Sequence, residues 1–183
     1  MFRPPFQPVA LGAFAGRSAL ARPLAPEARR SLAATGGVLI GPAFHLDLVR
    51  PGVGLFGGLP FADAAPVAHL SAPLLQVREI ARGESVGYGG TWVAQRPSRI
   101  GVLPVGYADG FFRGVQGARV FLDGRPAPVV GRVSMDMITV DLTDHPEPPA
   151  GAMVEILGMH QRVDDLAAAA GTIGYEVLTA LGP

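Results

Sequence analysis

A series of short apolar segments, each ended by turn-forming residues, begins at Pro73 and most constrains the fold of this chain. The clearest turn is Asp123-Gly124, which lies between two apolar runs. An Asp-Gly pair flanked in this way is the strongest short-range signal of a β-hairpin. The segment MITVDLT, residues 137–143, alternates between apolar and polar residues as a half-buried strand does. Further segments of this kind cover residues 74–83, 99–110 and 152–158. Short strands at this spacing predict an antiparallel β-domain.

Helices are expected near both ends of the chain. Residues 163–171, VDDLAAAAG, have acidic residues in the first turn and end at Gly171. Residues 172–181 begin a second helix, and residues 25–34 are predicted to form another, with Pro26 near its first turn. The chain before this last helix has no clear periodicity, and no structure is predicted there.

Residues 36–58 differ in character from the strand-like segments after Pro73. Two short apolar runs lie between Gly and Pro residues, which indicates buried strand or turn of the kind found in parallel α/β sheets. We therefore divide the chain into residues 1–58, the tail of an α/β unit, and residues 59–183, a nearly complete β-domain.

Composition excludes several classes of function. The 183 residues carry no net charge, so nucleic acid is a poor default partner. The chain has no cysteine, which rules out disulfides and a thiolate nucleophile and suits the cytoplasm. No apolar run reaches the length of a membrane span, and prolines interrupt the only candidate for a signal peptide. All 15 basic residues are arginine, so the chain contains no lysine.

Tyr88 stands among glycines in SVGYGGTW, residues 85–92. These glycines indicate a backbone that bends through positive φ or that another group approaches closely. Taken alone, the segment favours a strand tyrosine beside a bulge over a tyrosine whose hydroxyl does chemistry.

Five motifs, taken together, decide between these alternatives. LVRPGVGLFGG, VGYGGTW, VLPVGYADGFFR, PVVGRVSMDMITVDLT and GTIGYEVL occur in this order. From Ser31 to the end, the chain closely resembles the C-terminal half of bacterial alanine racemase, a pyridoxal-phosphate enzyme. The resemblance implies a mainly β C-terminal domain, a β-barrel with short helices, preceded by an α/β remnant of a TIM-type barrel. It also implies a head-to-tail homodimer that interconverts L-alanine and D-alanine by a two-base mechanism and supplies D-alanine for peptidoglycan.

The resemblance assigns cofactor-binding roles to residues of both parts. Arg50 would face the pyridine nitrogen and keep it unprotonated, which tunes the cofactor's electronics. The backbone N–H groups of Gly52 and Val53 would cradle the phosphate, as loops at the end of TIM-barrel strands do. The hydroxyl of Thr35, where the family usually has serine, and that of Tyr175 would complete the phosphate site. The alternatives are a salt-bridged arginine at Arg50 and a packed aromatic at Tyr175.

The same resemblance assigns catalytic and substrate-binding roles within the β-domain. Tyr88 would be one of the two catalytic bases, acting on one face of the substrate Cα. The main-chain N–H of Met135 would bind the substrate carboxylate, and Asp136 would belong to the surrounding network. Tyr107 would line the entrance across the dimer. A core methionine and a turn tyrosine are the alternatives for Met135 and Tyr107. The histidines are scattered and predict no metal site: His45, His69, His145 and His160.

The missing lysine sets this chain apart from the family. Covalent attachment of pyridoxal 5′-phosphate needs a Schiff-base lysine, and arginine cannot replace it. We therefore interpret the chain as a fragment, from a truncated gene, a misplaced start or a partial sequence, and expect it to be inactive alone. The alternative is a non-catalytic β-domain that acts as a binding or assembly module on a full-length racemase.

Overall fold

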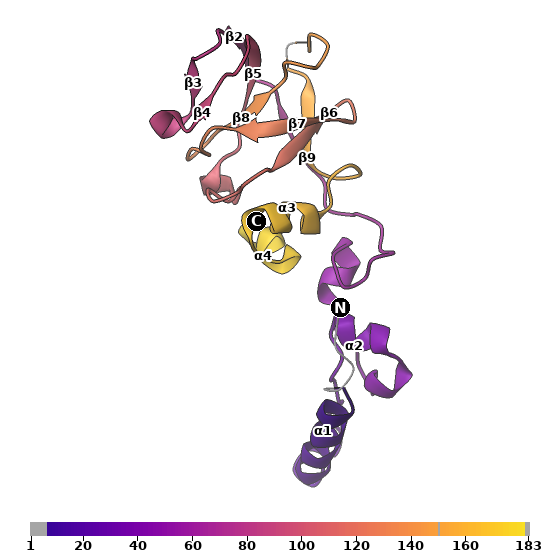
Figure 1. Cartoon of the computed structure of the whole chain (residues 1–183). Coiled ribbons are helices and arrows are strands. Elements are labelled where there is room, and N and C mark those ends of the chain that lie inside the picture. The colour runs from indigo at the N-terminus through magenta and orange to yellow at the C-terminus, as the bar shows by residue number, and fades with distance from the viewer. Residues whose placement is uncertain (1–6, 150, 182–183) are drawn as a thin grey trace.

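The computed structural model describes residues 7–149 and 151–181. Helical segments come first and a β-domain with two C-terminal helices comes after them (Figure 1). The helical elements of the first part are α1 (Gln7–Ala21), α2 (Thr35–Ile40), η2 (Pro42–Phe44) and η3 (Gly52–Phe56). The helices of the second part are η4 (Tyr88–Gly90), η5 (Tyr107–Asp109), α3 (Val163–Ala170) and α4 (Gly174–Ala180).

The predicted helix over residues 25–34 is wrong. The N–H of Arg30 donates to the Asp47 carboxylate at 2.9 Å, and the carbonyl of Ala33 accepts from the N–H of Arg50 at 2.8 Å. These bonds to a later segment take the place of the i→i−4 bonds that a helix needs. A helix forms earlier instead, in α1, where the sequence has no clear periodicity. Five of the 15 residues of α1 are alanine, which favours a helix without an apolar stripe, and most of its described side chains are exposed.

Residues 36–58 form turns and short helices rather than strands. The first apolar run of this segment lies in α2, and the second run lies in η3. Of the two predicted alternatives, buried strand is therefore wrong and turn is confirmed. Strand-like pairing is confined in this region to an isolated parallel bridge between Ala34 and Arg50. The assignment of residues 1–58 to a barrel remnant stays a prediction.

A seven-stranded sheet forms the β-domain in the order β1-β9-β6-β7-β8-β5-β2, and its neighbouring strands are antiparallel. Its strands are β1 (Leu70–Pro73), β2 (Gln76–Ile80), β5 (Ser98–Leu103), β6 (Arg119–Leu122), β7 (Arg125–Val130), β8 (Ile138–Asp141) and β9 (Met153–Leu157). A separate hairpin pairs β3 (Ser85–Val86) with β4 (Trp92–Val93). The predicted antiparallel β-domain is confirmed.

The two outer strands of the sheet, β1 and β2, adjoin one another in the chain. Only Leu74 and Leu75 separate them. The N–H of Leu74 bonds to the carbonyl of Ala152, beside β9, at 2.8 Å, and that of Leu75 bonds to Val102 in β5 at 2.9 Å. Because one short link reaches both sides of the sheet, the sheet must curl on itself as in a barrel.

The β6–β7 hairpin turns at Asp123-Gly124, as predicted. Asp123 has φ of 49° and Gly124 has φ of 75°, and Leu122 pairs with Arg125 across the turn. Positive φ at both central residues is the geometry of the two-residue hairpin turn that Asp-Gly favours.

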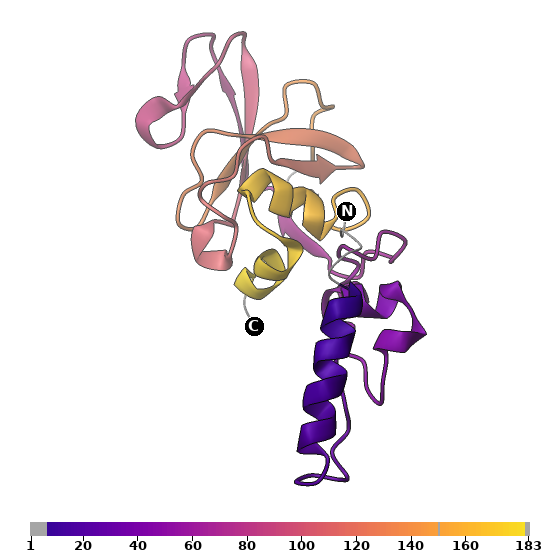
Figure 2. The ribbon, with the colours of Figure 1, turned by 60° about the horizontal axis from the view of Figure 1, so that its bottom comes forward.

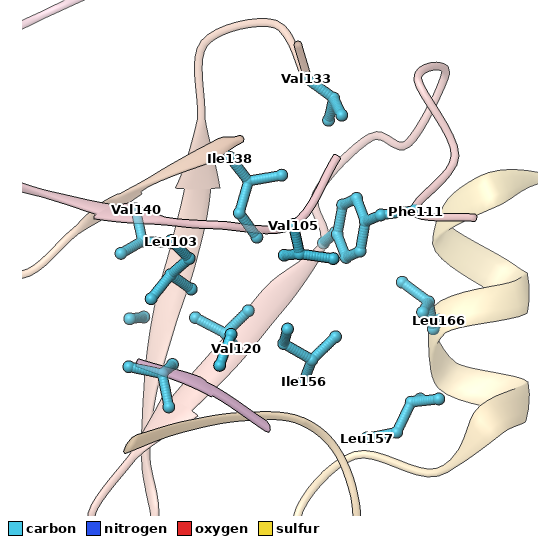
Figure 3. Close-up of a cluster of buried hydrophobic side chains, with 14 of the residues drawn as sticks. Leu103, Val105, Phe111, Val120, Val133, Ile138, Val140, Ile156, Leu157 and Leu166 are labelled. Atoms are coloured by element: carbon cyan, nitrogen blue, oxygen red, sulfur yellow. The ribbon is translucent and has the colours of Figure 1, made fainter. Parts of the chain in front are cut away.

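The core lies inside the curl of the sheet (Figure 3). Alternate residues of β6, β8 and β9 point into it, so that Val120 of β6, Val140 of β8 and Ile156 of β9 are fully buried. The predicted helices α3 and α4 are confirmed and lie beside the sheet (Figure 2), where Leu166 and Val177 join the same core. Among the described helices, none is both long and apolar enough to cross a membrane.

We expect Ile156→Ala to lower the free energy of unfolding by about 2–5 kcal/mol, because it leaves a cavity between β6, β9 and α3. Met153→Ala is the control on the same strand, since Met153 is 57% exposed, and it should change this free energy by less than about 0.5 kcal/mol. Urea denaturation followed by circular dichroism measures both. Equal losses in the two variants would contradict the placement of the core.

Candidate active site

Tyr88 lies in a turn and not within a strand. It begins η4, which connects β3 to β4, and its side chain is 69% exposed. Gly87, Gly89 and Gly90 all have positive φ, between 56° and 79°. The tight turn that these glycines permit holds the phenol out from the surface, so the alternative of a strand tyrosine is wrong.

The turn that carries Tyr88 packs closely on the loop after β7. A Cβ added to Gly87 would stand 2.7 Å from the backbone nitrogen of Arg132, and one added to Gly131 would stand 2.8 Å from the carbonyl oxygen of Val86. Both positions therefore require glycine. Beside this contact lies an open hollow of about 620 Å³ lined by Gln76, Gly87, Tyr88, Gly89, Val102, Arg132, Ser134, Met137 and Thr139.

Tyr107 and Met135 lie on two loops that bind each other through their backbones. The N–H of Tyr107 donates to Ser134 O at 3.1 Å, and that of Ala108 donates to Met135 O at 2.9 Å. A Cβ on Gly106 would approach Met135 O to 2.2 Å, so glycine is needed there as well. Tyr107, Met135 and the adjoining Asp136 are all exposed. The predicted core alternative for Met135 is therefore wrong.

The residues expected to hold a phosphate lie on three segments that meet. Thr35 begins α2, Gly52 and Val53 begin η3, and Tyr175 is in α4. The N–H of Gly54 donates to Thr35 Oγ1 at 3.1 Å. A Cβ placed on Gly52 would lie 3.9 Å from Cε1 of Tyr175. The structure thus brings a side-chain hydroxyl, the start of η3 and a phenol ring together.

Gly52 and Val53 precede the first hydrogen bond of η3, which the N–H of Gly54 donates to Pro51 O at 3.0 Å. Their own N–H groups therefore have no partner within this helix. Gly54 is the residue that lets Thr35 come near, because a Cβ there would lie 2.7 Å from Thr35 Cγ2. Sequence reasoning did not single out Gly54, although it belongs to the same VRPGVG motif.

Arg50 stands just before this loop. Its backbone bonds to Ala33, and its Nη1 donates to the Ser31 hydroxyl. The segments that hold Ser31–Thr35 and Arg50–Gly54 therefore run side by side. Among the ion pairs of the described residues, none involves Arg50. The predicted alternative of a salt-bridged arginine is not what the structure shows.

Just before these two segments, Arg30 and Asp47 join the chain in the same way. Arg30 donates to the Asp47 carboxylate from Nε at 2.9 Å and from Nη2 at 3.2 Å. The side-chain hydrogen bond from Arg30, together with the smaller contribution of its backbone N–H, lowers the pKa of Asp47 to about 2. This pair is the first of the contacts that join the two segments, and the bond between Thr35 and Gly54 is the last.

The two groups of candidate residues lie far apart within one chain. The β3–β4 hairpin, which carries Tyr88, and α2, which carries Thr35, are well separated in both views, with the rest of the β-domain between them (Figures 1 and 2). The sequence predicted the members of each group. It did not predict Arg132 as a neighbour of Tyr88, although Arg132 stands in the motif PVVGRVSMDM.

Comparison with known proteins matches residues 67–183 to the family model described as alanine racemase, C-terminal domain. The chain is 57% identical over 155 residues to the alanine racemase of Jannaschia sp. (strain CCS1), covering 84% of this chain and 45% of that protein. It is 50% identical over 163 residues to that of Acidiphilium cryptum, covering 86% and 46%. The chain thus spans about half the length of the curated relatives it matches.

Solved structures match most of this chain and about half of their own length. The biosynthetic alanine racemase from Pseudomonas aeruginosa has a TM-score of 0.81 at 44% identity, over 94% of this chain and 49% of that one. An alanine racemase from Bartonella henselae with covalently bound pyridoxal phosphate has a TM-score of 0.80 at 38% identity, over 91% and 48%.

The Arg30–Asp47 pair predicts a dependence on pH. Because the pKa of Asp47 is lowered from its ordinary value of 3.8 to about 2, its carboxylate stabilises the folded pairing above pH 3.8. This contribution is lost as the pH falls through 2. We expect the hydrogen-exchange protection factor of the Arg50 N–H to fall between about pH 5 and pH 2. In Asp47→Asn the protection factor of the Arg50 N–H should be low at both pH values. If it depended on pH in that variant as it does in the wild type, the role of the pair would be refuted.

Gly106→Ala tests the contact between the loops of Tyr107 and Met135. The new Cβ meets a backbone carbonyl and must push the loops apart, so the N–H groups of Tyr107 and Ala108 should lose about tenfold or more of their exchange protection. Gly114→Ala is the control, since a Cβ there meets nothing within 4 Å. Equal protection in the two variants would contradict the contact.

Proposed function

This chain belongs to the alanine racemase family, and we propose that it supplies part of an active site that interconverts L-alanine and D-alanine. The product D-alanine would serve peptidoglycan synthesis in the cytoplasm. The single observation that carries the proposal is the convergence of Thr35, Gly52 and Tyr175 at one place, with Arg50 immediately before it. These are the residues that the family resemblance assigns to the cofactor, and they come from segments far apart in the sequence.

The residues at this place fit pyridoxal 5′-phosphate. Thr35 Oγ1 accepts from Gly54 and so has its own proton free to donate. The N–H groups of Gly52 and Val53 and the hydroxyl of Tyr175 add further donors, which suit a phosphate. Arg50 would stand toward the ring nitrogen, where its permanent charge disfavours protonation. When bound, the cofactor supplies an electron sink that acidifies the Cα–H of alanine.

Tyr88 would act on one face of the substrate. Its glycine turn presents the hydroxyl to solvent beside a hollow that Arg132 also lines. There Tyr88 Oη would take a proton from Cα as the phenolate and return one as the phenol. The backbone N–H of Met135 would hold the substrate carboxylate, Asp136 would belong to the surrounding network, and Tyr107 would line the entrance. The contact between their loops supports a common role.

A site that uses both groups has to combine two chains. The Tyr88 turn lies on a different part of the molecule from α2 and α4, which carry Thr35 and Tyr175 (Figure 1). We therefore place Tyr88 of one chain opposite the cofactor of another in a head-to-tail homodimer. The exposed Tyr88 turn also favours a second candidate function, in which this chain is an assembly module that lends its tyrosine to a full-length racemase.

The absence of lysine limits what this polypeptide does alone. We expect the purified chain with pyridoxal phosphate and L-alanine to form no D-alanine, because nothing in it can hold the cofactor covalently or serve as a lysine base. When the chain is mixed with a full-length relative in which the matching tyrosine has been replaced by Phe, it should restore part of that relative's activity by supplying Tyr88. A chiral amino-acid assay measures both.

The Tyr88→Phe variant of this chain is the matched control for the mixture and should restore nothing. D-Alanine formed by the chain alone at enzymatic rates would overturn the requirement for lysine. A mixture that stays inactive with the wild-type chain would count against Tyr88 acting across the dimer.

A further inference from the structure

The residue before α3, Arg162, binds a loop that lies about a hundred residues earlier in the chain. Its Nη2 donates to Gly57 O and Ala64 O, both at 2.7 Å, and its Nη1 donates to Ala62 O at 2.8 Å. One guanidinium therefore closes the loop of residues 57–64 through three carbonyls. A planar fork with donors on two nitrogens suits this arrangement better than a lysine ammonium, whose donors all lie on one nitrogen.

Asp164, two residues later, reaches the same loop and also α4. Its Oδ2 accepts the N–H of Leu59 at 2.8 Å. Its Oδ1 would stand 2.9 Å from a Cβ on Gly174, the first residue of α4. The start of α3 thus contacts both the loop after η3 and the helix that carries Tyr175.

The loop in turn packs on η3. A Cβ on Gly58 would lie 2.5 Å from Cγ2 of Val53 and 3.5 Å from Cγ1 of Val163. Val53 is 3% exposed, and the N–H of Gly58 bonds to its carbonyl at 3.0 Å. The 57–64 loop is therefore joined to the backbone of Val53 at Gly58.

We propose that Arg162 is a positioning residue, which holds the Gly52–Val53 backbone against Tyr175 by closing the 57–64 loop. This role deepens the proposed function, on which it rests, because these groups would bind the phosphate. The family resemblance assigned nothing to Arg162. Within the described residues it forms no ion pair, and its Nε is buried without a partner. The guanidinium is therefore held by loop carbonyls alone.

The first test measures the nuclear Overhauser effect between the Tyr175 ring and the Cα hydrogens of Gly52. We expect it in the wild type and in Arg125→Gln, an exposed arginine in β7, and expect Arg162→Gln to lose it. Cross-peaks between Val120 and Ile156 should persist and report that the core is folded. An undiminished effect in Arg162→Gln overturns the proposal. If that variant does not fold, Arg162→Lys replaces it, and an undiminished effect there overturns the proposal equally.

The second test compares the affinities of the same variants for pyridoxal 5′-phosphate and for pyridoxal, which lacks the phosphate. The wild type should prefer the phosphate form, and Arg162→Gln should lose about tenfold of this preference, the equivalent of one charged hydrogen bond. A preference equal to that of the wild type overturns the positioning role alone. No preference in the wild type overturns the phosphate assignment of the proposed function, and with it the role of Arg162.

Discussion

The curl of the sheet is the constraint on which the rest of the structure depends. Because only Leu74 and Leu75 separate its two outer strands, the seven strands must close around one apolar interior. The core residues of β6, β8 and β9 then fill a single cluster, which α3 and α4 cover from one side. The β3–β4 hairpin leaves the sheet elsewhere, between β2 and β5. The fold therefore carries α4, which contains Tyr175, and the Tyr88 turn on separate parts of its surface.

Backbone contacts that only glycine allows place the candidate side chains. Gly87 and Gly131 let the Tyr88 turn touch the loop after β7, and Gly106 lets the Tyr107 loop touch Met135. Each contact brings main-chain atoms closer than a Cβ would permit, so the geometry is set by backbone rather than by flexible side chains. Rigid support of this kind is what a group needs if it is to transfer a proton at a defined position.

Local signals predicted the β-domain well and the first part poorly, for a physical reason. Strand alternation and the Asp123-Gly124 turn act over a few residues, and α3 has a clear start and end in the sequence. The 25–34 segment has helical composition, but Arg30 bonds to Asp47, a partner that no local pattern reveals. The five motifs predicted which residues belong to the candidate site. Their division into two distant groups, and the contacts of Arg132 and Arg162, depend on tertiary packing that the sequence does not show.

The lack of lysine and the distance between the two groups both indicate that the proposed reaction would be shared between two chains. Arginine can hold a loop, as Arg162 holds the 57–64 loop through three carbonyls, or carry a fixed charge, as Arg50 does, but it does not replace lysine in a Schiff base with an aldehyde. The proposed racemisation needs proton transfer on opposite faces of Cα, and in it Tyr88 would serve only one of them. A group on another surface would serve the opposite face. In the proposed reaction, a chain whose Tyr88 turn lies apart from its own Thr35, Gly52 and Tyr175 would contribute only when a second chain faces it.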